Sequence, residues 1–370
     1  MDKIKSRQVA LMYSLIFCSL YLGTIDIVIL NESKQNVFIS MILGNIIGII
    51  PILLYLKIND YNTNLNIYQK NKYLFKKKLG NILNIIIILI NFLLLSVVVR
   101  KTIVFLTSKY LYNTSFLFVG LLLSFVNIVI CLKSIGTIII LNEIVFFIIL
   151  VLTFIIQFSL LKFVDLNNIF PLFIKTSFFK STIKPSIYYA SCSSLLIFTL
   201  LTINKDKIKD KKNYNKSIII SYIVSSILLL IVMFFVISCL GYKMAYIFRY
   251  PEYILLKKIS INNSELHLEN ILGIRWLLYK FSLCNICLYN ILKGIKNIFK
   301  ITSSKIIIII SIIISMFSIL IAYYFFGNTV TKVIINSEKY YLFFITIPIM
   351  LILIIVLVKS KIKNQIKNKV

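Results

Sequence analysis

Small and hydroxyl-bearing side chains interrupt two apolar runs, and these interruptions are where the sequence could hold a small ligand. In residues 8–30 the interruption is Gly23 and Thr24, and in residues 187–203 it is a serine-rich stretch. A helix that breaks inside a membrane frees backbone N–H groups, whose partial positive charge suits a carboxylate. Serines that bond back to the preceding turn and only bend the helix are the alternative explanation of the second interruption. The predicted ligand-binding residues are Gly23, Thr24, Ser191, Cys192, Ser193 and Ser194, with Phe198 selecting the ligand side chain.

Four ionisable residues fall within or beside apolar runs, where a charge is costly and therefore a candidate for function. Glu143 and Lys280 lie at complementary depths in their runs, which predicts a buried pair between these two side chains. Asp26 and Arg275 lie closer to the ends of their runs, from which long side chains can reach water. We therefore expect Asp26 and Arg275 to be solvated.

Hydrolytic, redox and metal chemistry have little support in the residue types present. The chain has one histidine, and its six cysteines all fall in apolar runs. The spacing of Cys284 and Cys287 only places two small polarisable side chains on one helix face. No glycine-rich phosphate loop and no paired carboxylates in an aqueous cleft can be assembled. The sequence therefore predicts neither an enzyme nor a metal or cofactor site.

The elements that must position these residues are membrane helices. Hydrophobic residues make up 59% of the 370 residues and charged residues 14%, far from the composition of soluble domains. A helix needs about 20 apolar residues to cross the hydrocarbon core. Ten runs qualify: about 8–30, 37–56, 83–104, 115–132, 137–161, 187–203, 217–240, 272–292, 306–326 and 341–358. The chain is predicted to be an all-α polytopic membrane protein forming a single integral membrane domain over 1–370.

The positive charge is distributed between the apolar runs and does not form one patch. The formal net charge of +29 would suggest nucleic acid in a soluble protein, but anionic lipid headgroups explain basic loops between membrane helices. Lys and Arg are more abundant in the loops on the side of both termini than in the alternate loops, and cytoplasmic loops carry that excess. Both termini are therefore predicted to be cytoplasmic, with 359–370 a basic tail, and no nucleic-acid partner is expected.

Ten runs divide into two sets of five, and a second set that begins on the opposite face forms an inverted repeat. The first five-helix repeat would cover 1–161 and the second 187–358. In such folds the first helix of each half is broken near the middle of the membrane, close to the ligand. The interruptions at Gly23 and at Ser191–Ser194 occupy those matching positions. In the second helix, Gly44 and Gly48 predict close packing against another helix.

Two blocks of residues resemble the B subunit of endospore germinant receptors. The first is Ser6-Arg7-Gln8 before the first run, followed by the stretch Lys34–Ser40 and MILGNIIG. The second is Arg249-Tyr250-Pro251, followed by Ile274-Arg275-Trp276-Leu277-Leu278 and Tyr289. Their order and spacing agree with that family over essentially the whole chain.

This resemblance implies a fold, a location and partners. The family is similar to the amino acid, polyamine and organocation permeases, which share the five-plus-five inverted repeat. It implies a nutrient sensor in the inner spore membrane or cell membrane, assembled with A and C subunits, that binds a small molecule such as an amino acid and triggers germination. The family commonly has a Gly-Glu pair in the sixth helix, where this chain has Ser193 and Ser194. An autonomous amino acid permease is the alternative, and neighbouring genes or uptake by the chain alone would distinguish the two.

Overall fold

A computed structural model describes residues 4–173, 178–248, 250–257, 260–261, 264–265, 267–324 and 346–363. Within these ranges the chain is helical apart from a hairpin of two-residue strands, β1 (Ser260–Ile261) and β2 (Ser264–Glu265). In the described part of the chain, seven helical segments are long and apolar enough to cross a membrane, and the shorter apolar helix Phe116–Cys131 accompanies them. The prediction of an all-α polytopic membrane protein is confirmed at this level. Positions 325–326 and 341–345 of the last two predicted runs fall in parts of the chain that are not described.

The principal helices follow the predicted apolar runs in order. They are α1 (Ser6–Leu20), α2 (Asp26–Ser33), α3 (Val37–Asp60), α4 (Ile67–Lys109), α5 (Phe116–Cys131), α6 (Ile135–Leu160), α7 (Lys184–Phe198), α8 (Tyr214–Ile247), α9 (Pro251–Lys257), α10 (Leu268–Phe299) and α11 (Ser304–Tyr324), with a last helix over 346–363. Short helical turns connect them at Lys34–Asn36, Leu161–Phe163, Leu166–Ile169, Phe179–Ile183, Thr199–Thr202, Lys205–Lys207 and Lys211–Asn213. Asn66, Ser115 and Ser134 cap the starts of α4, α5 and α6 with their side-chain oxygens, which explains where these helices begin.

The first predicted helix is broken, as the sequence indicates. Between α1 and α2 the segment Tyr21–Ile25 contains two residues with non-helical backbone angles, Leu22 with ψ of 126° and Gly23 with φ of 67°. A left-handed φ costs an L-residue about 1–2 kcal/mol, and glycine avoids that cost. Gly23 therefore allows the chain to leave the helix at this point, and Asp26 begins the next half-helix.

The sixth helix is not broken where the sequence predicted, and this prediction is wrong. α7 runs without interruption through Ser191–Ser194. The hydroxyl of Ser191 donates to the carbonyl of Tyr188 at 2.7 Å, and that of Ser194 donates to the carbonyl of Ser191 at 2.6 Å. These serines satisfy their hydroxyls within the helix, so they need no break and free no backbone groups for a ligand.

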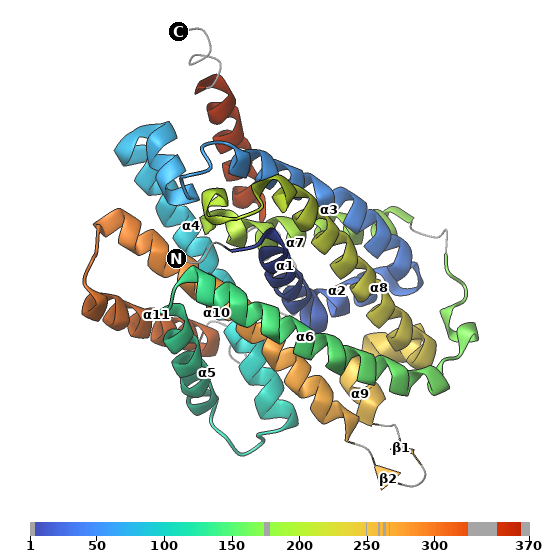
Figure 1. Cartoon of the computed structure of the whole chain (residues 1–370). Coiled ribbons are helices and arrows are strands. Elements are labelled where there is room, and N and C mark those ends of the chain that lie inside the picture. The colour runs from blue at the N-terminus through green and yellow to red at the C-terminus, as the bar shows by residue number, and fades with distance from the viewer. Residues whose placement is uncertain are drawn as a thin grey trace.

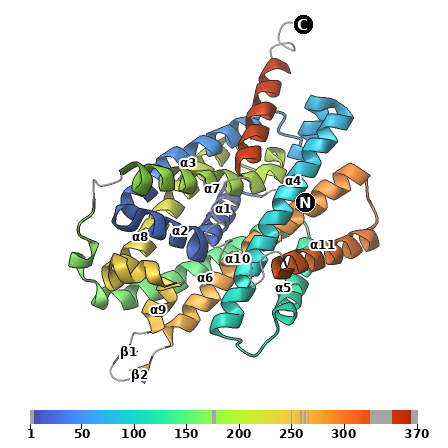
Figure 2. The same cartoon turned by 180° about the vertical axis from the view of Figure 1, so that it is seen from behind.

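α1 lies in the middle of the bundle, in contact with α6, α7, α8 and α10 (Figure 1). Seen from behind, α4 packs along α10, and α5 and α11 lie together beside them (Figure 2). α3 packs against α7, where the predicted close approach is found. A Cβ atom at Gly44 would lie 2.8 Å from the Tyr189 ring, and one at Gly48 would lie 2.6 Å from Ser193 Oγ. The helices can approach this closely only because both positions lack a side chain.

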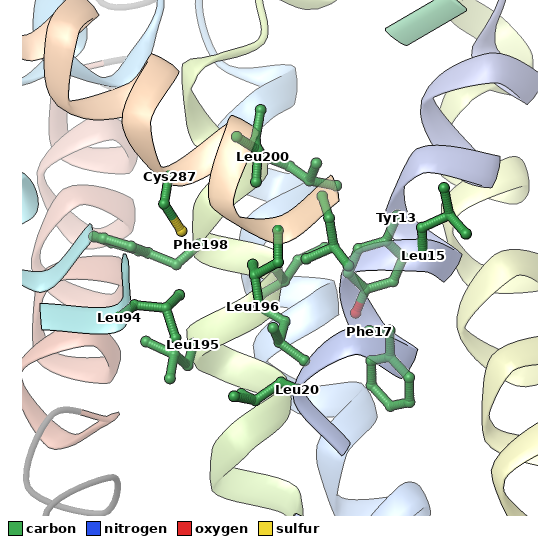
Figure 3. Packing of buried hydrophobic residues seen from close by; sticks show 14 of the residues in the cluster. Tyr13, Leu15, Phe17, Leu20, Leu94, Leu195, Leu196, Phe198, Leu200 and Cys287 are labelled. Atoms are coloured by element: carbon green, nitrogen blue, oxygen red, sulfur yellow. The ribbon is translucent and has the colours of Figure 1, made fainter. Parts of the chain in front are cut away.

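One large cluster of buried apolar side chains joins α1 to its neighbours. Tyr13, Leu15, Phe17 and Leu20 of α1 belong to it together with Leu195, Leu196 and Phe198 of α7 (Figure 3). Many large apolar side chains on α5, α6 and α11 are instead exposed, for example Phe125 at 69% and Phe154 at 65%. Apolar faces of this size suit contact with lipid tails, so the structure positions α1 and its break inside the protein and the outer helices against the bilayer.

Candidate small-molecule site at the helix break

The end of the first half-helix meets a buried lysine. Lys280 of α10 is 6% exposed, and its ammonium group donates to the carbonyl oxygens of Ser19 and Leu22, the latter at 3.0 Å. The last carbonyl groups of a helix have no partners within it and carry partial negative charge. At the break, these carbonyl groups therefore surround a cation of the protein itself, the ammonium group of Lys280.

The start of the second half-helix is occupied by a carboxylate of the chain. Asp26 accepts hydrogen bonds from the N–H of Gly23 at 3.1 Å and from the N–H of Ile27 at 2.8 Å. These are the backbone groups that the sequence assigned to a ligand carboxylate. Because Asp26 already binds them, a ligand carboxylate would have to displace it. We expected Asp26 to reach water through its side chain. Its carboxylate instead caps the start of α2 and lines the cavity.

A buried ion pair lies next to the break. Arg275 donates to Oε1 of Glu252, and their side chains are only 1% and 7% exposed. The prediction that Arg275 is solvated is therefore wrong, because α9 brings a carboxylate to it inside the protein. Among the described residues, Oε2 of Glu252 and Nε of Arg275 have no hydrogen-bond partner. An unpaired oxygen of a buried carboxylate is an available acceptor for a ligand donor.

Trp276 covers the break. A Cβ atom at Gly23 would lie 2.8 Å from the indole ring, so the ring rests on the glycine. Phe105 and Tyr250 pack on the same indole with centroid distances of 4.8 and 5.7 Å. The indole N–H is buried and lacks an acceptor within the described part of the chain. Trp276 is thus held by aromatic packing and retains a free donor.

These groups surround a small cavity. It is lined by Tyr21, Leu22, Gly23, Asp26, Ile27, Leu30, Met41, Tyr189, Leu229, Val232, Met233, Val236, Pro251, Glu252 and Trp276. Its free volume is about 20 Å³, room for about one or two water molecules. The lining is mainly apolar with two carboxylate side chains, the composition expected of a site that orients a small polar molecule. The cavity lies directly against the break.

The residues predicted as ligand-binding are only partly brought together. Gly23 lines the cavity, and Thr24 lies in the same backbone segment. Ser193 lies behind it, 3.2 Å from the hydroxyl of Tyr21, whose own hydrogen bond goes to the carbonyl of Tyr189 at 2.8 Å. Ser191, Cys192, Ser194 and Phe198 are absent from the lining, and Phe198 belongs to the packed cluster with Cys287 (Figure 3).

The predicted pair between Glu143 and Lys280 does not form. Glu143 accepts hydrogen bonds from Arg7 at 2.9 Å and from Gln8 at 2.7 Å, near the start of α1, while Lys280 binds the carbonyls at the break. The two side chains lie at opposite ends of α1. Complementary depths along separate helices could not reveal this, because α1 lies between Glu143 and Lys280 and supplies a closer partner to each.

A profile of the family described as spore germination protein matches residues 3–324. The chain belongs to this family. The resemblance drawn from the sequence is confirmed, and a spore germination protein of this kind is of the membrane transporter or receptor type. No curated protein matches it.

The germination protein also shares its fold with a solved transporter. The structure titled a substrate-bound, outward-open state of a Na⁺-coupled sialic acid symporter is 14% identical, with a TM-score of 0.64, covering 87% of this chain and 73% of that one. At this identity the likeness concerns the fold alone. It agrees with the transporter fold implied by the family.

Sequence reasoning missed the residues that close the site, namely Tyr21, Tyr189, Glu252 and Trp276. Glu252 directly follows Pro251 in a loop between apolar runs, where it reads as a solvated residue. The usable signal was the pairing of opposite charges: an arginine at the edge of one apolar run and a glutamate shortly before it, each costly to bury alone. The chain's single tryptophan, directly beside that arginine, was the second signal.

Proposed function

We propose that this germination protein is the membrane subunit of a nutrient germinant receptor and that its ligand binds at the break between α1 and α2. The observation that carries this proposal is the small cavity at Gly23, lined by the carboxylate residues Asp26 and Glu252 and by Trp276, whose indole N–H has no acceptor among the described residues. Ten spans in two inverted repeats of five, with both termini in the cytoplasm, complete the proposal. The transporter fold and the order of the described helices support this arrangement.

The cavity suits a ligand that carries an ammonium group, such as an amino acid or another small amine. Oε2 of Glu252 has no hydrogen-bond partner among the described residues, and Asp26 adds a second negative side chain. Trp276 can donate its indole N–H to an oxygen of the same ligand. The sequence pointed to the ligand's carboxylate as the main contact. The structure favours its ammonium group instead, because Asp26 takes the N–H groups at the start of α2.

The small volume of the cavity couples ligand binding to a change of conformation, which receptor activation requires. Free space of about 20 Å³ cannot contain an amino acid, so binding requires the surrounding side chains to move. A ligand that prefers an open arrangement shifts the population toward it by its differential affinity. In a receptor that shift would be passed to the A and C subunits in the inner spore membrane, which the family resemblance implies as partners.

An autonomous permease for amino acids is the second candidate, and the fold of the sialic acid symporter favours it. The two are separated by placing the chain alone in sealed vesicles and measuring uptake of radiolabelled amino acids. We expect no accumulation above protein-free vesicles, and a germination response in spores only when the partner subunits are present. Uptake by the chain alone at transporter rates would contradict the receptor function.

A further inference from the structure

A second, larger cavity lies at the end of the molecule opposite α9. It has a volume of about 710 Å³ and is formed by the N-terminal segment, the start of α6, the loop before α8 and the end of α10. Five lysines line it: Lys5, Lys133, Lys207, Lys209 and Lys296. Figure 1 shows the N-terminus beside α6 and α10 at this end. Loops far apart in the sequence therefore converge to form one basic cavity.

The charge of this cavity is strongly unbalanced. Among the described residues, Asp206 is the only acidic residue of the lining, and its carboxylate binds Lys211. The first turn of α6 adds Ile135 and Gly136, and first-turn N–H groups carry partial positive charge. All five lysines are exposed, so their ammonium groups are accessible to a ligand. Several ammonium groups together with helix N–H groups suit an anion that has several oxygen atoms.

An apolar strip leads away from the cavity along α6. Ile140 lines the cavity and is 47% exposed. Ile144, Phe147 and Ile148 follow it at helical spacing and are 55%, 51% and 45% exposed. A ligand that fills the cavity and continues onto this strip therefore has an anionic head and an apolar tail.

We propose that this cavity binds the phosphate-bearing headgroup of an anionic phospholipid, with its acyl chains on the exposed face of α6. Basic pockets between membrane helices on the cytoplasmic side are suited to such headgroups. A free phosphate would not use the apolar strip, and an acidic peptide would not extend into the bilayer beside α6. One phospholipid molecule would thus occupy both the basic cavity and the apolar strip.

The headgroup would act on the element that carries the helix break. Ile4 pairs with the loop before α8, with its N–H 3.2 Å from the carbonyl of Lys207 and its carbonyl 2.9 Å from the N–H of Lys209. Arg7 and Gln8 hold α6 through Glu143. A phosphate bound between Lys5, Lys133 and Lys207 bridges the same elements. Anionic lipid therefore stabilises the attachment of α1 to α6 and to the loop before α8.

The test measures lipid binding to the purified full-length chain in detergent by native mass spectrometry and by thermal stabilisation. The probes are phosphatidylglycerol, cardiolipin, phosphatidylcholine and inorganic phosphate. The variant Lys133→Gln/Lys207→Gln/Lys209→Gln removes three lysines of the cavity. Its matched control is Lys162→Gln/Lys180→Gln/Lys184→Gln, which removes three exposed lysines near the other ends of α6 and α7.

We expect the anionic lipids to bind more tightly than phosphatidylcholine, and the cavity variant to weaken this binding about a hundredfold, since each lysine contributes about a factor of five near an anionic surface. The control should bind as the unaltered chain does, and Ile140→Asn should weaken lipid binding with the lysines intact. The proposal would be overturned if the control variant lost lipid binding equally or if anionic lipids were not preferred. It would also be overturned if inorganic phosphate alone stabilised the chain as much as the lipids do.

Discussion

At the scale of single residues, the ion pair between Glu252 and Arg275 is the contact that single substitutions should disturb most. Both side chains are almost fully buried, so removing one charge leaves the other without compensation. Breaking one partner of a buried pair typically costs about 3–5 kcal/mol, whereas replacing both is close to neutral. Glu252→Gln and Arg275→Met should each lower the thermal stability of the purified chain, and the double variant should recover most of the loss.

Asp206 provides the control for this pair, because its carboxylate binds Lys211 while both side chains stay exposed, at 47% and 44%. Exposed pairs contribute about 0–1 kcal/mol. Asp206→Asn should therefore change stability little. If the losses of thermal stability from Glu252→Gln and Arg275→Met simply add in the double variant, the two side chains do not interact.

Lys280 compensates the carbonyl groups at the end of the first half-helix. Its ammonium group binds the carbonyls of Ser19 and Leu22, and an unsatisfied buried group costs about 1–3 kcal/mol. Lys280→Ala should lower thermal stability, and sodium chloride should restore part of it relative to choline chloride, since carbonyls at a broken helix suit Na⁺. The unaltered chain should show no such preference. If both salts affect the stability of Lys280→Ala equally, the carbonyls at the break do not bind Na⁺ in place of the lysine.

At the scale of the elements, the break between α1 and α2 depends on Gly23. Gly23→Ala introduces a left-handed φ for an L-residue and a Cβ atom 2.8 Å from the Trp276 ring. The backbone alone costs about 1–2 kcal/mol. We expect reduced stability and loss of the nutrient response of spores that carry this variant with its partner subunits.

Gly136 is the matched control for Gly23. It lies in the first turn of α6, and a Cβ atom there would meet only Ser134 Oγ at 3.5 Å, an ordinary contact. Gly136→Ala should keep the response and leave stability unchanged or raise it by up to about 1 kcal/mol. An unchanged nutrient response in Gly23→Ala spores with normal protein levels would place the ligand elsewhere.

At the scale of the whole molecule, the N-terminal segment is attached to the loop before α8 through Asp210. Burial alone would raise the pKa of Asp210, but hydrogen bonds from the Ser6 hydroxyl and backbone N–H outweigh it and hold the pKa below its ordinary value. A lowered folded-state pKa stabilises the fold above the unfolded pKa of about 3.9, and this contribution is lost as pH falls through the folded value.

The unaltered chain should therefore lose stability in thermal melts as the pH falls below about 4. Asp210→Asn should be less stable at neutral pH and lose less below that point. Ser6→Ala should resemble it, because it removes the hydroxyl that binds the carboxylate. If all three proteins show the same dependence on acid pH, this attachment does not contribute to stability.

The orientation of the molecule gives a further prediction at this scale. Lys133 and Lys162 flank the two ends of α6. With cytoplasmic termini, a cysteine at Lys162 should react with an impermeant maleimide from outside intact cells, and one at Lys133 only after permeabilisation. Cys239 is half-buried and the other five cysteines are buried, so Cys239→Ser provides a low background. The reversed labelling pattern would invert the topology.

The sequence by itself determined the membrane character, the order of the apolar helices and the break at Gly23. These depend on properties that are local along the chain: the length of an apolar run, a residue that tolerates a left-handed φ, and small residues four apart at Gly44 and Gly48. Each can be recognised without knowing which helix lies beside which.

The tertiary structure alone decided the partners. Glu143 lies next to Arg7, Lys280 next to the carbonyls at the break, and Arg275 next to Glu252. A charge in a membrane helix must find compensation, but the sequence does not say which of several helices supplies it. For Ser191 and Ser194 the compensation came from their own helix, so no break formed. The packing of α1 among its neighbours decides which groups come within hydrogen-bond distance of one another. The site therefore depends on the three-dimensional arrangement of the helices.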